Sequence, residues 1–135
     1  MKDEMLKEAI HLHKQGGYSF LATASAKGVP HIACAGNIER VSDDSIAITE
    51  CFCPHTVRNL SENNSLSLVL WDQGKDTGFQ LLGTSQRLED ASLFDNPADK
   101  ESRPPVPQGA WKLLMNVNKV LAFTHAPHTD DECEA

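Results

Sequence analysis

The spacing of apolar residues changes from a helical to a strand-like period within the first twenty-five residues. A helix over residues 3–15 is predicted by the positions that share one face: Met5, Leu6, Ala9, Ile10 and His13. Gly16-Gly17 supplies a C-terminal stop for this helix. Three stretches with strand-like composition follow at residues 18–25, 30–41 and 45–49. Because the turns at 27–28 and 42–44 are short, these three strands are predicted to form an antiparallel meander.

The second half of the chain begins with a short helix and continues in strands. Residues 56–63 are predicted to be helical, and residues 65–71 and 78–88 to be strands. Gly83 lies inside the second of these strands, which indicates a bulge or a close approach of another backbone.

A proline-rich connection separates the last strand from the others. Residues 97–109 hold four of the seven prolines, so we expect an exposed connection there. Residues 111–124 return to apolar alternation and are predicted to be a strand with five core residues: Leu114, Val117, Val120, Ala122 and Phe123. The tail 126–135 is polar and acidic, and we expect it to be loose.

These elements predict a mainly β (α+β) fold, a six-stranded antiparallel split β-barrel with a few short helices. Closure of the sheet is favoured because a flat sheet of six strands would leave exposed edges. At 135 residues, the chain is the length of one domain, so residues 1–135 are predicted to form a single domain.

The charge of the chain narrows the choice of partners. The net charge is −7, and a nucleic-acid surface needs clustered lysine and arginine, so we expect no nucleic-acid partner. An anionic ligand needs only one local cationic pocket, which an acidic protein can form. Neither a signal peptide nor an apolar run of membrane-spanning length is present, which predicts a cytoplasmic protein with no membrane partner and with reduced cysteines.

Five short motifs, in this order, resemble the pyridoxamine 5′-phosphate oxidase-like split-barrel flavoproteins, especially their small bacterial FMN-binding members. The motifs are Phe20-Leu21-Ala22-Thr23-Ala24 with Gly28-Val29-Pro30-His31, then Cys34-Ala35-Gly36-Asn37, Ile46-Ala47-Ile48, His55-Thr56-Val57-Arg58-Asn59-Leu60 and Thr77-Gly78-Phe79-Gln80-Leu81-Leu82-Gly83-Thr84. Each motif alone is weak, and their common order and spacing carry the resemblance.

The resemblance implies a non-covalent FMN cofactor bound in a two-fold homodimer with two equivalent sites. It implies a redox role, with electrons supplied by a nicotinamide cofactor, NAD(P)H, or by a small redox protein. Whether the protein is an enzyme or an electron carrier stays open. The residues predicted to hold FMN are Cys34, Ala35, Gly36, Asn37, Glu50, Cys51, Phe52, His55, Thr56, Arg58 and Gln80.

The chain departs from the family pattern at His55, where many relatives carry lysine or arginine. Positive charge for the phosphate must then come from protonated His55 or from Arg58. Thr56 adds a hydroxyl near the helix N-terminus, whose free N–H groups favour anions, although a threonine there can also simply cap a surface helix. Nothing in the chain matches the pyridoxine-phosphate substrate site, so we do not predict pyridoxamine-phosphate oxidation.

For the flavin ring, the small residues Ala35 and Gly36 would allow close approach, with Cys34 or Asn37 beside the ring. Gln80 can hydrogen-bond the polar edge of the ring, or be an ordinary exposed strand residue. The aromatic residues Trp71 and Phe52 could pack on the ring or belong to the core.

Other readings of the same residues remain open. Cys51, Cys53 and His55, with His31 as a conceivable fourth ligand, could form a zinc or iron site. A second possible metal cluster consists of His125, His128 and Cys133 in the tail. The barrel could also be a non-catalytic module for haem or a deazaflavin.

Overall fold

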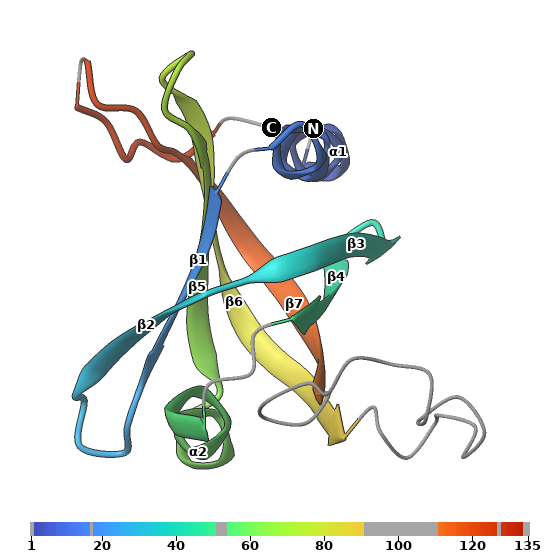
Figure 1. The fold of residues 1–135 in the computed structure, drawn as a ribbon, viewed down its shortest axis with the longest axis vertical. Helices are drawn as coiled ribbons and strands as arrows, with labels where there is room; N and C mark the ends of the chain where they lie inside the picture. The colour runs from blue at the N-terminus through green and yellow to red at the C-terminus, as the bar shows by residue number, and fades with distance from the viewer. Residues whose placement is uncertain (1, 17, 51–53, 91–110, 127, 134–135) are drawn as a thin grey trace.

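A computed structural model describes residues 2–16, 18–50, 54–90, 111–126 and 128–133. Two helices and seven strands follow in the order α1 Lys2–Lys14, β1 Tyr18–Ala24, β2 Pro30–Cys34, β3 Gly36–Ser42, β4 Ser45–Glu50, α2 Pro54–Glu62, β5 Ser65–Asp72, β6 Thr77–Asp90 and β7 Trp111–Ala122. The strands form one antiparallel sheet in the order β2-β1-β5-β6-β7-β4-β3 (Figure 1). The predicted mainly β class is confirmed.

The two edge strands of the sheet are consecutive in the chain, so the sheet closes on itself. In Figure 1, β2 and β3 form a continuous band that crosses in front of the other strands. β2 pairs with β1 and β3 pairs with β4, while Ala35 between them donates its N–H to the Ser19 carbonyl at 2.9 Å. Asn37, just after the junction, has a positive φ of 47°. The prediction of one strand over 30–41, and hence of six strands, was wrong because the chain bends at this junction and changes its partner.

Side chains that alternate along the strands build the core inside the barrel. Four leucines of β5 and β6 are buried there, Leu66, Leu68, Leu70 and Leu81, and the partly buried Leu88 packs against them. In Figure 1, α1 and α2 lie at opposite ends of the barrel. α1 buries Leu6, Ala9 and Ile10 against the core. α2 is tied to β1 by a buried hydrogen bond from Asn59 Nδ2 to Thr23 Oγ1 at 3.1 Å.

Gly83 lies at a bulge where another backbone approaches closely, as predicted. The pairing of β6 with β7 shifts register between Leu82 and Gly83, and a Cβ at Gly83 would lie 1.8 Å from the Asn116 carbonyl oxygen. Across this shift Gly83 pairs with Val117 and Leu82 with Lys119, so β7 contains an extra residue.

The extra residue in β7 changes which of its side chains face the core. Val117 and Val120 are buried as predicted, whereas Leu114, Ala122 and Phe123 are only half-buried. The buried positions before the bulge are instead Leu113 and Met115. The prediction of Leu114 as core was wrong because the bulge reverses which side chains of β7 face inward: Val120 after the bulge and Leu113 and Met115 before it all face the core.

The polar tail is attached to the barrel, in contrast to the predicted loose tail. We name residues 124–133 the C-terminal strap, of which residue 127 is not described. Ala122 donates its N–H to the Asp131 carbonyl at 2.8 Å, and Cys133 donates to the Val120 carbonyl at 2.8 Å. Thr124 also pairs with Thr129, so the strap folds back antiparallel to the end of β7. In the described residues, neither helix is long and apolar enough to cross a membrane.

Candidate functional site

Two buried polar atoms near the N-terminus of α2 have no hydrogen-bond partner among the described residues. The Thr56 side chain is 1% exposed, and its Oγ1 has no hydrogen-bond partner among the described residues. The same holds for the buried Nδ1 of His31 on β2. The His31 and His55 rings touch edge to face, with centroids 5.4 Å apart. Buried polar groups are normally hydrogen-bonded, so two such unpaired groups near one helix N-terminus favour a polar ligand there.

The local sequence explains why these groups converge. Pro54 begins α2 at a position where its missing N–H costs nothing. His31 pairs with Thr23 across β1 and β2, which puts it at the end of the barrel where α2 packs. The free N–H groups of the first helical turn and the helix dipole favour an anion there.

Arg58 does not join this group. The buried residues of α2 are Thr56, Asn59 and Leu60, whereas Arg58 is exposed. Two residues apart on a helix correspond to about 200° of rotation, so Arg58 projects away from Thr56.

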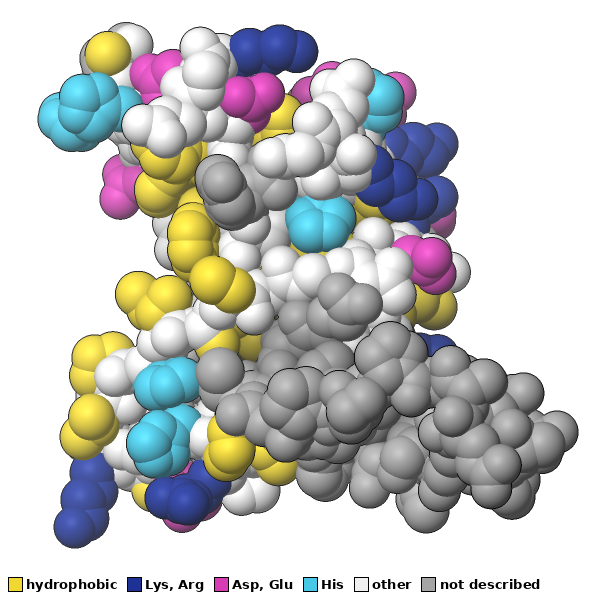
Figure 2. Space-filling view, in the orientation of Figure 1, with side chains coloured by type: hydrophobic (Ala, Val, Ile, Leu, Met, Phe, Trp, Pro, Cys, Tyr) yellow, Lys and Arg dark blue, Asp and Glu magenta, His cyan; other side chains and the backbone are white. Residues whose placement is uncertain are grey.

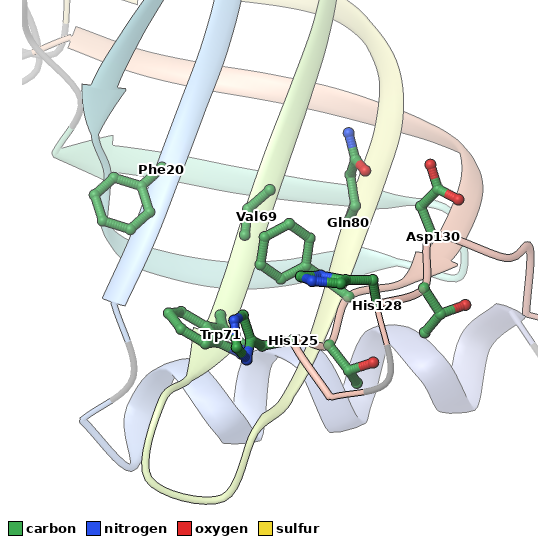
Figure 3. Close-up of a pocket in the computed structure, with 10 residues that line it drawn as sticks. Phe20, Val69, Trp71, Gln80, His125, His128 and Asp130 are labelled. Carbon is green, nitrogen blue, oxygen red and sulfur yellow. The ribbon is translucent and has the colours of Figure 1, made fainter.

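A larger pocket of about 630 Å³ lies on the opposite, outward face of the sheet. Its lining residues are Phe20, Val69, Trp71, Gln80, Phe123, Thr124, His125, His128, Thr129 and Asp130. In Figure 3, Phe20, Val69 and Gln80 project from neighbouring strands, with His125, His128 and Asp130 on the strap beside them. Gln80 Nε2 donates to Ser67 Oγ at 2.8 Å, which fixes the amide on the sheet. A pocket of this size, with the aromatic side chains of Phe20, Trp71 and Phe123 in its wall, suits a planar organic ligand.

Asp76 holds the strap against this pocket. Its Oδ1 accepts hydrogen bonds from the His125 N–H at 2.7 Å and from Trp71 Nε1 at 3.2 Å, and its Oδ2 accepts from the Ala126 N–H at 2.8 Å. These donors, above all the His125 N–H, hold the pKa of the Asp76 carboxyl below its ordinary value. Sequence reasoning missed Asp76, because its two partners on the strap lie about fifty residues further along the chain.

The predicted ring-side residues of the β2–β3 junction point in different directions. Cys34 is exposed and lies opposite Phe20, whereas Ala35 is buried in the core. Gly36 pairs with Glu50, and the Asn37 amide donates to the Thr49 hydroxyl. The Glu50 side chain and the predicted site residues Cys51 and Phe52 lie outside the described part of the structure.

The predicted residues therefore fall into two groups on opposite faces of the sheet. At the α2 end, Thr56 is buried and His31 is half-buried on the core side of β2, with the exposed His55 against its ring, while Cys34 and Gln80 face outward. The outward face is apolar and unusually accessible, with Phe20 37% and Ile32 68% exposed. Figure 2 shows hydrophobic side chains in a band along the side of the molecule where β1 and β2 lie. No described pocket contains both groups.

The metal alternatives receive no support from the described residues. Within them, no three histidine, cysteine or acidic side chains are arranged to hold a metal ion. Cys133 packs against the core, and its burial raises the pKa of the thiol. The His125 and His128 rings, 4.9 Å apart, instead belong to the outward pocket, so the predicted tail cluster is not formed. Cys51 and Cys53 lie outside the described residues, and the site predicted with them stays a prediction.

Comparisons with known proteins agree with this architecture. HupZ of Group A Streptococcus superposes with a TM-score of 0.68 at 19% identity, covering 92% of this chain and 96% of HupZ. An FMN-binding protein of Syntrophomonas wolfei superposes with a TM-score of 0.65 at 17% sequence identity. The match covers 90% of this chain and 88% of that protein. A putative pyridoxamine 5′-phosphate oxidase of Lactobacillus delbrueckii superposes with a TM-score of 0.62 at 19% sequence identity. The match covers 84% of this chain and 90% of that protein. At these identities the likeness concerns the fold.

The sequence itself gives the stronger assignment. No curated protein matches the chain. The family model described as pyridoxamine 5′-phosphate oxidase matches residues 5–113, which is most of the chain. The chain belongs to the pyridoxamine 5′-phosphate oxidase-like family of FMN-binding split barrels.

Proposed function

We propose that the protein is a flavoprotein that binds FMN non-covalently between two copies of the chain and uses it for electron or hydride transfer. The observation that carries this proposal is the buried hydroxyl of Thr56 in the first turn of α2, which has no hydrogen-bond partner among the described residues. The Nδ1 of His31, whose ring touches that of His55 in the same turn, likewise has none. The family adds weight, because its fold binds FMN and one structural relative is an FMN-binding protein.

The phosphate of FMN fits the α2 terminus chemically. A phosphate dianion accepts hydrogen bonds from backbone N–H groups, from the Thr56 hydroxyl and from imidazole N–H groups. His31 and His55 touch, and either ring could carry the positive charge that the family's lysine or arginine provides elsewhere. In this proposal the two histidines replace that residue, and Arg58 takes no part.

A second copy of the chain would resolve the separation of the two residue groups. The flavin ring would lie against the apolar outward face, where Gln80 supplies a polar edge and Phe20 and Trp71 a flat wall. If the phosphate is held by one protomer and the ring by the outward face of its partner, a two-fold dimer has two equivalent sites. Dimer formation would also cover the exposed Ile32.

Bound flavin supplies the redox chemistry, and the protein supplies binding, orientation and exclusion of water. We propose a nicotinamide cofactor or a small redox protein as the electron donor. A deazaflavin is the competing ligand, since an F420 reductase shares the fold with a TM-score of 0.56 at 12% identity, covering 82% of this chain and 93% of the reductase.

The test combines spectroscopy with mass measurement. We expect the protein as purified to be yellow, to release FMN on denaturation and to scatter light as a dimer at micromolar concentration. Its flavin bands should bleach on anaerobic titration with dithionite. A colourless protein that fails to bind added FMN would contradict the proposal, and so would a single-chain mass for the FMN-loaded form.

A further inference from the structure

Two walls of the outward pocket are tied together by one carboxylate that lies outside its lining. The walls are Trp71, on β5, and the C-terminal strap, which contributes His125. Asp76, in the β5–β6 turn, accepts hydrogen bonds from Trp71 Nε1 and from the backbone N–H groups of His125 and Ala126. In Figure 3, Trp71 and His125 lie together at one end of the pocket. The Asp76 carboxylate therefore fixes how the strap sits against the sheet.

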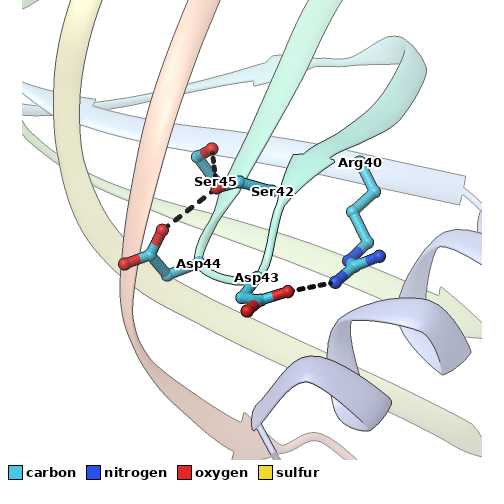
Figure 4. Close-up of polar contacts among 5 residues, drawn as sticks. All are labelled: Arg40, Ser42, Asp43, Asp44 and Ser45. Carbon is cyan, nitrogen blue, oxygen red and sulfur yellow. Dashed lines mark hydrogen bonds and ion pairs between the residues drawn. The ribbon is translucent and has the colours of Figure 1, made fainter.

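The β3–β4 turn shows the more usual behaviour of carboxylates in a turn. Asp43 Oδ1 accepts a hydrogen bond from Arg40 Nη2 at 2.8 Å, and Asp44 Oδ1 accepts one from the Ser42 hydroxyl at 3.1 Å (Figure 4). These contacts join residues three and two positions apart. The two strap residues bound by Asp76 are 49 and 50 positions away from it. Asp76 thus stabilises more than the turn that contains it.

Backbone pairing anchors the strap on both sides of the turn that contains His125. Before this turn, Phe123 donates its N–H to the Gly78 carbonyl at 3.0 Å. After it, Cys133 donates its N–H to the Val120 carbonyl at 2.8 Å. Loss of the carboxylate in the β5–β6 turn would therefore free the strap turn between these anchors without releasing the whole strap.

We propose that Asp76 is a positioning residue for the flavin ring, because it holds the strap as a wall of the outward pocket. This inference rests on the proposed function, in which that pocket takes the ring. The His125 and His128 rings on the strap are 4.9 Å apart, and Trp71 packs edge to face on Phe123 at 5.9 Å. A planar ring between these walls buries more apolar surface than a ring on the open sheet. Because the strap is already in place, the ligand does not have to order it.

Asp76→Gly is the variant that isolates the carboxylate. Asp76 has a positive φ of 47°, which glycine adopts without strain, so the substitution leaves the turn its conformation. Asp76→Asn also tolerates this φ and keeps one acceptor oxygen. Lys75→Gly is the matched control, because it adds the same backbone freedom to the same turn. Lys75 is exposed, and glycine keeps its N–H, which donates to Asp72.

The test is titration with riboflavin and with FMN, followed by flavin fluorescence. We expect Asp76→Gly to raise both dissociation constants by the same factor, about tenfold or more, the equivalent of one charge-assisted hydrogen bond. The visible circular dichroism of the bound flavin, which reports the surroundings of the ring, should change as well. Lys75→Gly should match the unsubstituted protein in both measurements, and Asp76→Asn should lie between that protein and Asp76→Gly. Far-ultraviolet circular dichroism establishes that each variant is folded.

Three outcomes would overturn this inference alone. The first is an Asp76→Gly variant with the flavin affinities and the visible circular dichroism of the unsubstituted protein. The second is an equal loss of affinity in Lys75→Gly, which would indicate general loosening of the turn. The third is weaker binding of FMN with unchanged binding of riboflavin, because Asp76 would then act on the phosphate. An unsubstituted protein that binds neither ligand would overturn the proposed function together with this inference, so the two failures are distinguishable.

Discussion

Replacing Thr56 by valine should affect stability and FMN affinity in opposite directions. The substitution exchanges a hydroxyl for a methyl group at a side chain that is 1% exposed. Because Oγ1 has no hydrogen-bond partner among the described residues, the flavin-free protein carries the cost of a buried unsatisfied group, about 1–3 kcal/mol. We expect the free energy of unfolding of flavin-free Thr56→Val to be unchanged or higher by up to this amount.

The effect on ligand binding follows from the proposed phosphate contact. A hydrogen bond from a hydroxyl to a charged acceptor contributes about 1.5–3 kcal/mol, so the Kd for FMN should rise about 10- to 150-fold. Riboflavin lacks the phosphate, and its Kd should not change. Quenching of flavin fluorescence measures both constants, and urea unfolding followed by circular dichroism measures stability.

Thr23→Val is the matched control. Thr23 is also buried, but its Oγ1 accepts a hydrogen bond from Asn59 Nδ2. Valine there leaves the Asn59 amide without its partner, so we expect a loss of stability of about 1–3 kcal/mol. If Thr56→Val destabilises the flavin-free protein as much as Thr23→Val does, and FMN and riboflavin weaken equally, the phosphate does not lie at this helix terminus.

Four further predictions concern the barrel and the strap. Gly83→Ala should destabilise the fold by at least about 1–3 kcal/mol in urea unfolding, because its Cβ would lie 1.8 Å from the Asn116 oxygen; an unchanged midpoint would contradict this. Asp76→Asn should speed amide hydrogen exchange in the strap without changing exchange in β1. In the unmodified protein, the lowered pKa of Asp76 means that its support for the strap is present above the ordinary value of 3.8 and is lost as the pH falls through the folded-state pKa. Trp71 emission reports this loss, and an acid-insensitive signal would count against it. Iodoacetamide should modify exposed Cys34 faster than Cys133, whose burial raises the thiol pKa, as peptide mass spectrometry can show.

The elements of the fold that depend on local sequence were predictable. Helical spacing around Leu6 and Ala9 gave α1, and alternation around Leu68 gave β5. What escaped prediction depends on pairing between distant segments. The bend at Ala35 exists because β2 and β3 pair with different strands. The strap is attached because Asp76, between β5 and β6, accepts hydrogen bonds from its backbone.

The candidate site also combines features that follow from local sequence with features that depend on contacts between distant segments. Thr56 and His55 are adjacent in sequence and at a helix start, so their proximity followed from spacing. The placement of Arg58 was also available from helical geometry, because two residues along a helix turn the side chain to the other side. His31 meets His55 only through the packing of α2 against β2.

Closure of the sheet through β4 and β7 has a consequence for the order of events during synthesis. Ser45 pairs with Asn116 and Ile48 with Leu113, so β4 cannot form this pairing until β7, about seventy residues further along the chain, has been synthesised. Until that partner leaves the ribosome, Ile46 and Ile48 have no strand to complete their edge of the barrel. Unpaired apolar strand edges are prone to aggregation, and non-local pairing slows folding. The nascent chain should therefore depend on chaperones most strongly while its last strand is still being translated.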